Sequence, residues 1–249
     1  MKKLFVLAVA LSVCLSAIVL VCAQEKKEEE KTICDQKFNL MSGADEVGKL
    51  QLKATTKGDE LTIVKSMTMT MQGKNLEYTS TVKYKTKPSL APVEAHAVTK
   101  IDGKETMDGT VKFSEKKCDI SMVGKHDKQG NPIDPPKKVE IKDVVIPEGT
   151  IVFSLGIVGP MILDKPGEKG DIVHAEFPDD FKVPELINLK ENYKITREEA
   201  KEDGSFTMRL IWVCTDEPEI TVESVEFDKD GKIKSMEFGK NLKAVPAKE

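Results

Sequence analysis

Alternation of apolar and polar side chains is the feature that most constrains how this chain folds, and it is clearest in segment 61–71. One parity of that segment is apolar, at Leu61, Ile63, Met67, Met69 and Met71. The other parity holds threonine or serine at positions 62, 66, 68 and 70. Because successive side chains of a strand point to opposite faces of a sheet, this pattern predicts a strand with one apolar face.

The same alternation recurs through the first half of the chain, between short turns that contain glycine. Turns are predicted at 57–59, 72–74 and 102–103, because glycine adopts the backbone angles that tight hairpins require. The strands predicted around these turns are 48–55, 61–71, 75–85, 93–101, 105–113 and 117–123. Together they predict an antiparallel meander, which is larger and more stable than an isolated hairpin.

Segment 124–138 lacks this alternation. It is polar and contains Pro132, Pro135 and Pro136, so it is predicted to be a loop. Such a loop could separate two domains, but the following half is also rich in strand patterns, and we favour one continuous sheet. The domain prediction is therefore a single β-rich domain at 33–239, followed by a flexible tail at 240–249.

The second half contains one strongly apolar segment, 151–163, among further strand patterns. Gly156 and the pair Gly159-Pro160 limit any helix there to about two turns, so a short buried helix is predicted. Strands are expected at 172–177, 193–200, 205–215, 219–227 and 232–238. The apolar parity slips within the last two strands, which is what a β-bulge produces, and bulges bend sheets.

These observations predict a mainly β fold. We expect a curved antiparallel sheet, a half-barrel or open barrel, with the short apolar helix or a loop against its concave face.

The N-terminus has the pattern of a signal peptide at 1–23. Lys2 and Lys3 precede an apolar run at 4–21, and cleavage is expected after Ala23. The charged segment 24–32 is expected to be disordered. The protein is then exported to the periplasm or the exterior. Two alternatives are an uncleaved anchor and a membrane tether through a lipidated Cys22.

The charge balance argues weakly against some partners. Loss of Lys2 and Lys3 changes the formal net charge from −4 to −4 − 2 = −6, which disfavours nucleic acid and anionic membranes. After cleavage, the rest of the chain contains no apolar run long enough to span a bilayer. The expected partner is therefore an apolar small molecule, a lipid or a lipoprotein, and no nucleic acid.

Cleavage after Ala23 would leave three cysteines. In an oxidising compartment, a Cys118–Cys214 disulfide is the first choice, because both residues lie in strand-like segments. Cys34 could equally be a partner. The alternative is three buried thiols that act as small apolar side chains.

The sequence contains no recognisable catalytic or metal-binding motif. The methionine stripe at 67–71 could hold copper(I), but core packing or an apolar groove explains it better. His96, His126 and His174 do not have the spacing of zinc ligands, so no metal and no cofactor are expected. We expect a protein that is not an enzyme. Catalysis would require His96 or His174 to converge with a carboxylate in a cleft.

Two segments carry a resemblance to a known family. Val47-Gly48 stands before an alternating strand, and segment 228–233 reads Asp-Lys-Asp-Gly-Lys-Ile in the last predicted hairpin. Over about 38–238 the pattern resembles the LolA-type half-barrel lipoprotein carriers and their uncharacterised exported relatives. The resemblance implies a curved sheet that holds lipid on its concave face. It carries no functional residue over.

The sequence therefore predicts an exported, non-catalytic protein that binds an apolar ligand, a lipid or a lipoprotein. The expected lining is Leu61, Ile63, Met67, Met69, Met71, Tyr78 and Val82. The alternative is a structural or interaction protein of the cell envelope, in which the same residues form a closed core. An open groove of several hundred cubic ångströms would favour the first hypothesis.

Overall fold

The computed structural model describes residues 29–71, 73–127, 131–146, 149–176, 188–213, 218–239 and 241–248. Residues from Lys31 onward form one compact unit. The predicted signal peptide at 1–23 lies outside the described residues, as does most of the charged segment 24–32. The last two residues of that segment, Lys31 and Thr32, belong to the first strand.

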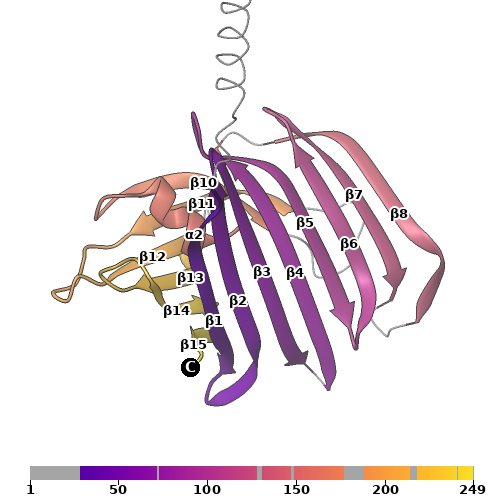
Figure 1. Cartoon of the computed structure of the whole chain (residues 1–249), viewed down its shortest axis with the longest axis horizontal. Coiled ribbons are helices and arrows are strands. Elements are labelled where there is room, and N and C mark those ends of the chain that lie inside the picture. Colours follow the sequence, from indigo (N-terminus) through magenta and orange to yellow (C-terminus); the bar gives the residue numbers. More distant parts are fainter. Residues whose placement is uncertain are drawn as a thin grey trace, which may run out of the picture. The chain divides into compact units, whose positions relative to one another are not determined.

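The first half of the unit is a series of long strands joined by tight turns, as the alternating pattern predicts. They are β1 (Lys31–Ser42), β2 (Asp45–Lys57), β3 (Glu60–Met71), β4 (Lys74–Lys85), β5 (Ala91–Ile101), β6 (Lys104–Phe113), β7 (Lys117–His126) and β8 (Pro132–Val145). Each strand pairs antiparallel with the next. Figure 1 shows these strands side by side from β1 to β8.

The second half has shorter strands and one short helix. They are β9 (Thr150–Val152), α2 (Leu155–Ile162), β10 (Lys169–Glu176), β11 (Asn188–Arg197), β12 (Phe206–Trp212), β13 (Ile220–Phe227), β14 (Ile233–Phe238) and β15 (Leu242–Pro246). The strands β10 to β15 pair antiparallel with their neighbours, whereas β9 pairs parallel with β10.

All these strands belong to one open sheet. Its order is β8-β7-β6-β5-β4-β3-β2-β1-β15-β14-β13-β12-β11-β10-β9. The two halves are joined where β1 pairs with β15, so strands from the two ends of the unit are neighbours. The expected fold class is confirmed: the protein is mainly β, with one continuous antiparallel sheet and a short apolar helix. A single hydrophobic cluster contains inward-facing residues from both halves of the sheet.

The predicted loop at 124–138 is wrong. β7 continues to His126, and β8 begins at Pro132 and includes Pro135 and Pro136. The prolines are tolerated because β8 is an edge strand of the sheet, where a backbone without an N–H loses no ladder hydrogen bond on its outer side. Proline in an edge strand and proline in a loop look alike in a sequence.

The predicted flexible tail at 240–249 is also wrong. β15 pairs with β1 on one side and with β14 on the other, and Ala244 is fully buried. The five residues of β15 are too few to show a clear alternation. The strand forms because it covers the edges that β1 and β14 would otherwise expose.

The two predicted parity slips are β-bulges. The pairing of β12 with β13 skips Val222, and the pairing of β13 with β14 skips Lys234. In β14 the bulged Lys234 is exposed and lies between the buried Ile233 and Met236, and the apolar parity changes there. In β13 the parity changes after the bulged Val222.

The short helix α2 is the buried segment that the sequence predicts within 151–163. It is apolar throughout, and residues 155–159 are all buried. Its glycines let it lie close to the sheet: a Cβ on Gly156 would be 3.0 Å from Cδ1 of Ile233, and one on Gly159 would be 3.1 Å from Cε of Met208. The helix therefore packs through its small residues against β12 and β14.

A buried tyrosine ties the two halves together across the core. The Tyr84 hydroxyl donates to the carbonyl of Ile151 (3.4 Å) and accepts from the backbone N–H of Phe153 (3.2 Å). Tyr84 lies on β4 and is fully buried. Burial raises the pKa of this phenol above its ordinary value, so the hydroxyl keeps its proton and remains a donor. Tyr84 thus fixes the segment between β9 and α2 against the first half of the sheet.

Replacing Tyr84 with phenylalanine is expected to lower the free energy of unfolding by about 1–3 kcal/mol, because a buried carbonyl and a buried N–H lose their partner. Urea denaturation measures this change. Thr79→Val is the control, since it removes a hydroxyl from an exposed position on the same strand and should change stability by less than about 0.5 kcal/mol. Equal effects of the two substitutions would contradict a structural role for the Tyr84 hydroxyl.

β2 passes unusually close to β3 at Gly48. A Cβ on Gly48 would overlap the carbonyl oxygen of Thr68 and lie 2.8 Å from Cα of Met69. Gly48 also adjoins an irregularity in the pairing with β1, between Leu40 and Met41. Glycine is required here because any side chain would displace the backbone of β3.

Gly48→Ala is therefore expected to destabilise the protein by about 1–3 kcal/mol, the usual cost of overpacking. Gly170→Ala is the matched control, because a Cβ there would meet Cδ2 of Leu163 at an ordinary 3.5 Å. Thermal unfolding of the two variants distinguishes them. A Gly48→Ala variant as stable as Gly170→Ala would show that the strands are farther apart than described.

Candidate ligand-binding pocket

A pocket of about 380 Å³ lies between the two halves of the sheet. We call it the inner pocket. Its walls come from β3 and β4 on one side and from β10, β12, β13 and β14 on the other, with the segment that precedes α2 between them. It is lined by Ile63, Lys65, Met67, Tyr78, Ser80, Val82, Phe153, Ser154, His174, Ala175, Leu210, Val222, Glu223, Phe238 and Gly239.

Four of the seven predicted lining residues are in this pocket. Ile63, Met67, Tyr78 and Val82 line it. They are brought together by the register of β3 and β4, in which Ile63 lies opposite Val82 and Met67 lies opposite Tyr78. A strand period of two then puts both pairs on the same face.

The other three predicted residues have different positions. Leu61 is fully buried in the core and does not line the pocket. Met69 is partly buried on the same strand and is not part of the lining either. The side chain of Met71 lies outside the described residues. The apolar face of β3 therefore passes from packed core at Leu61 to pocket wall at Met67, a division that periodicity cannot reveal.

The predicted lining did not include Lys65, Ser80 or Glu223, and the sequence named His174 only for the catalytic alternative, in which it would meet a carboxylate in a cleft. Lys65 and Ser80 form the cross-strand pair between the two apolar pairs on β3 and β4. His174 on β10 and Glu223 on β13 line the opposite wall. Lys65 was visible in the sequence as a charge on the apolar parity of segment 61–71. His174 and Glu223 carry no such signal, because their positions depend on how the second half folds over the first.

The bulge in β13 shapes the wall that carries Glu223. Val222 is the bulged residue, and both Val222 and Glu223 line the pocket although they are adjacent in sequence. In a regular strand, adjacent side chains point to opposite faces. The bulge therefore allows the chain to present an apolar and an acidic side chain to one cavity.

The electrostatics of the pocket are set by Glu223 and its basic neighbours. Burial raises the pKa of the Glu223 carboxyl, and its electrostatic interactions with Lys65 and His174 offset part of that rise. The Lys65 Nζ also lies over the ring of Phe238, 5.6 Å from its centroid. The His174 ring lies against Tyr193 of β11, with centroids 5.2 Å apart. Three ionisable groups thus meet in one partly apolar cavity.

A second cavity of about 620 Å³ lies toward the β5 and β8 side of the unit. Its lining includes Phe113, Ile146 and Ile151. Phe113 contacts Phe153 of the inner pocket edge to face, with ring centroids 6.0 Å apart. This aromatic pair therefore lies between the two cavities.

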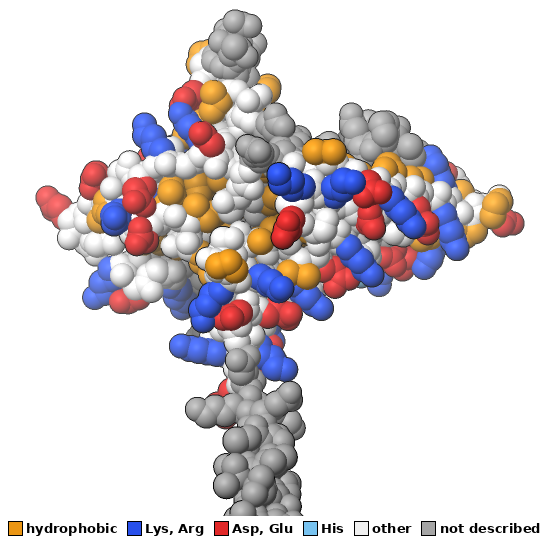
Figure 2. All heavy atoms as spheres, turned by 90° about the horizontal axis from the view of Figure 1, so that it is seen from above, with side chains coloured by type: hydrophobic (Ala, Val, Ile, Leu, Met, Phe, Trp, Pro, Cys, Tyr) orange, Lys and Arg blue, Asp and Glu red, His pale blue; other side chains and the backbone are white. Residues whose placement is uncertain are grey.

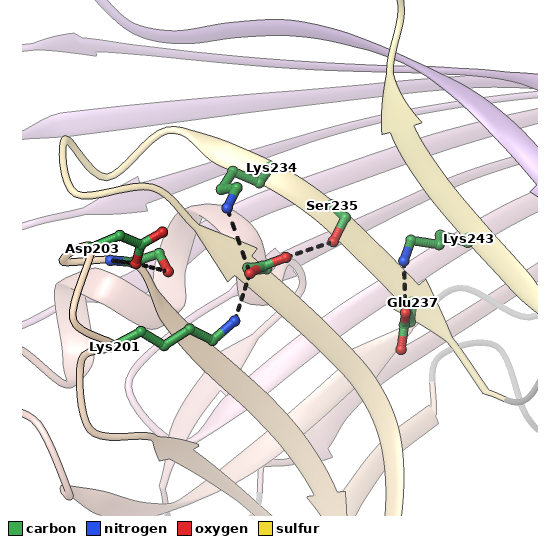
Figure 3. A network of polar contacts seen from close by, with 8 residues as sticks. Lys201, Asp203, Lys234, Ser235, Glu237 and Lys243 are labelled. Carbon is green, nitrogen blue, oxygen red and sulfur yellow. Dashed lines mark hydrogen bonds and ion pairs between the residues drawn. The ribbon is translucent and has the colours of Figure 1, made fainter.

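Ion pairs lie on β13 and β14. Glu226 on β13 accepts from Lys201 (2.8 Å) and lies 3.7 Å from Lys234. Figure 3 shows the side chains of Lys201 and Lys234 pointing toward the same carboxylate. The pKa of Glu226 is lowered, chiefly by the hydrogen bond from Lys201. On the face drawn in Figure 2, basic and acidic side chains are interspersed, so that face has no extended area of one sign. Such exposed ion pairs contribute little to stability individually.

The histidines occupy three different environments. His96 contacts Asp108 at 2.8 Å on the outer face of β5 and β6. His126 ends β7, and its Nδ1 is 2.8 Å from the carbonyl oxygen of Glu105. Only His174 of the three lines the inner pocket, where it shares the cavity with the carboxylate of Glu223.

The predicted disulfide is not tested, because Cys214 lies outside the described residues. Cys118 is a buried free thiol on β7, and Cys34 is a partly buried free thiol on β1. Burial raises the pKa of Cys118 to about 11, which keeps the thiol protonated and unreactive.

Neither a metal cluster nor a membrane-spanning helix is found in the described part of the chain. No group of three or more His, Cys, Asp or Glu side chains there could hold a metal ion. Over the same residues, no helix has the length and apolar character that a bilayer crossing requires.

Comparisons with known proteins identify no family. A scan against protein-family models finds no match, and neither does a search of curated proteins. Among solved structures, the chain is similar to the crystal structure of a beta-barrel-like protein of domain of unknown function DUF1849 from Brucella abortus. The two are 9% identical with a TM-score of 0.46, and the match covers 86% of this chain and 95% of the other. The resemblance to LolA-type carriers is not confirmed.

Glu223 is expected to make the protein less stable as the pH rises, whereas most carboxyl groups of folded proteins have the opposite effect. The pKa of Glu223 is raised in the folded state. Its contribution to the free energy of unfolding is therefore most favourable below the ordinary glutamate value of 4.5 and is lost as the pH rises through the folded-state pKa. Glu223→Gln should therefore have a higher Tm than the unmodified protein at pH 8, and the difference should close toward pH 4. Glu237→Gln is the control, because Glu237 is exposed on the adjacent strand. A lower Tm for Glu223→Gln at pH 8 would contradict this prediction.

Proposed function

We propose that this protein binds an apolar or amphipathic ligand, such as a lipid, in the inner pocket. The observation that carries the proposal is the cavity of about 380 Å³ between the two half-sheets, lined by Ile63, Met67 and Val82. Its volume falls in the range of small-molecule sites, which is roughly 300–1,000 Å³. Its lining combines apolar side chains with polar ones, and polar groups that fix the orientation of a ligand are typical of such sites.

Methionine supports this role at Met67. Its side chain is flexible and polarisable, so it can adapt to apolar ligands of different shape. Met67 is only partly buried, whereas Leu61 on the same face is fully buried. The apolar face of β3 is therefore accessible to a ligand at Met67.

The proposal includes export, for which the support is the sequence pattern of residues 1–23. Intact mass of the protein recovered from its own cell envelope tests this part. Loss of the first 23 residues is expected. Retention of the full N-terminus, or a mass increment on Cys22, would show that the protein is anchored and not secreted.

The alternative is a structural or interaction protein of the cell envelope with a closed core. Its support is the burial of Leu61, Ile63 and Val82, which are at most 4% exposed. Catalysis is a further alternative, because His174 and Glu223 share the inner pocket. Mass spectrometry of the ligand after incubation separates binding from catalysis: a bound molecule is recovered unchanged.

Met67→Trp tests the binding proposal directly. The larger side chain should fill the pocket and weaken the binding of Nile red to delipidated protein by at least tenfold, with little loss of stability. Met69→Trp is the matched control, because Met69 has the same side chain on the same face of β3 but does not line the pocket. Dye fluorescence and urea denaturation are measured for both.

The closed-core alternative gives the opposite result. The unmodified protein would then bind no dye, and Met67→Trp would be destabilised by about 1–3 kcal/mol through overpacking. That outcome would overturn the proposal.

A further inference from the structure

The polar groups of the inner pocket form a band between apolar walls. Along β3 and β4, the pair Lys65–Ser80 lies between the apolar pair Ile63–Val82 and the pair Met67–Tyr78. Glu223 and His174 line the wall opposite Lys65, and both Lys65 and His174 act on the charge of Glu223. A ligand in this pocket therefore meets polar groups at one level and apolar side chains on both sides of it.

Lys65 is the one group of the band that can only donate hydrogen bonds, through its three N–H groups. The hydroxyls of Ser80 and Ser154 can both donate and accept. Among the described lining side chains, Glu223 is the single carboxyl, and it becomes a donor when it is protonated. A ligand group that only accepts hydrogen bonds therefore matches Lys65 together with a protonated Glu223.

We propose that the ligand is a long-chain carboxylic acid, and that its carboxylate is bound by Lys65 and shares a proton with the carboxyl of Glu223. This inference rests on the proposed function and specifies its ligand class. An alkylammonium group would face Lys65 at close range, and like charges in a desolvated pocket repel. A neutral alcohol would bring no negative charge to Lys65 and would form only the weaker, uncharged kind of hydrogen bond.

The shared proton has a consequence for pH. Two carboxyl groups close together in a desolvated site cannot both ionise, so one of them retains a proton. Binding then takes up a proton once both free groups are ionised, and the affinity falls on the order of tenfold per pH unit. The titratable groups that face Glu223 are Lys65 from β3, Tyr78 from β4 and His174 from β10, with Tyr193 of β11 behind His174.

The test compares three probes of equal chain length: dodecanoate, 1-dodecanol and dodecylamine. Their binding to the delipidated full chain is measured by displacement of Nile red between pH 5.5 and pH 8.5. Dodecanoate is expected to bind at least tenfold more tightly than dodecylamine at pH 6, with 1-dodecanol between them. Dodecanoate affinity should fall as the pH rises, whereas 1-dodecanol affinity should stay constant.

Substitutions of Lys65 and Glu223 test whether these residues cause the preference for dodecanoate and its pH dependence. Lys65→Met should lower the affinity for dodecanoate at least tenfold and change the affinity for 1-dodecanol by less than twofold. Lys65→Arg keeps the positive charge and should therefore keep the affinity for dodecanoate. Glu223→Gln should keep dodecanoate binding at pH 8.5 near its pH 6 value. Lys83→Met and Glu237→Gln are controls, since both residues are on strands that form the pocket walls but neither lines the pocket.

The outcomes separate this inference from the proposed function. If 1-dodecanol binds but dodecanoate is not preferred, or if Glu223→Gln retains the pH dependence, the carboxylate inference is overturned and ligand binding stands. If none of the three probes displaces the dye, or if the dye does not bind, the proposed function itself fails.

Discussion

The pairing of β1 with β15 is the contact on which the rest of this structure depends. It joins two half-sheets that the chain builds separately, and it puts Phe38 beside Pro246 and Leu40 beside Ala244. Beyond the end of β15, the side chain of Gln36 continues the connection. Its amide donates to the carbonyl of Ile233 (3.0 Å) and accepts from the N–H of the same residue (3.1 Å). A side-chain amide thereby replaces a backbone pair between β1 and β14.

Once the half-sheets are joined, their apolar faces bury each other together with α2, which is the only helix in the described part of the chain. The short helix α2 and the hydroxyl of Tyr84 are the means by which the second half is held against the first. Gly156 and Gly159 let the helix lie close to the sheet, and Tyr84 satisfies the backbone between β9 and α2. A buried polar contact of this kind specifies one arrangement of the core more strictly than apolar packing alone.

The inner pocket lies where the facing walls do not fill the space between them. On one wall, Lys65 and Ser80 interrupt an otherwise apolar pair of strands. On the other wall, the bulge at Val222 turns two adjacent side chains toward the same cavity. The charged groups therefore sit among apolar ones, where burial acts strongly on Glu223. This combination of apolar area and donor groups is what favours an amphipathic ligand over a purely apolar one.

The sequence by itself determined strands β2 to β7, the short helix and the positions of the two bulges, because each depends on a local period or on glycine and proline at particular positions. It also indicated Ile63, Met67, Tyr78 and Val82 as one face, since register follows from a tight hairpin. Only the tertiary structure decided that Leu61 is core while Met67 borders a cavity, and that His174 and Glu223 meet Lys65. Those facts depend on contacts between residues more than a hundred positions apart, which no local pattern encodes. The same holds for β8 and β15, whose irregular sequences become strands because neighbouring strands offer them an edge.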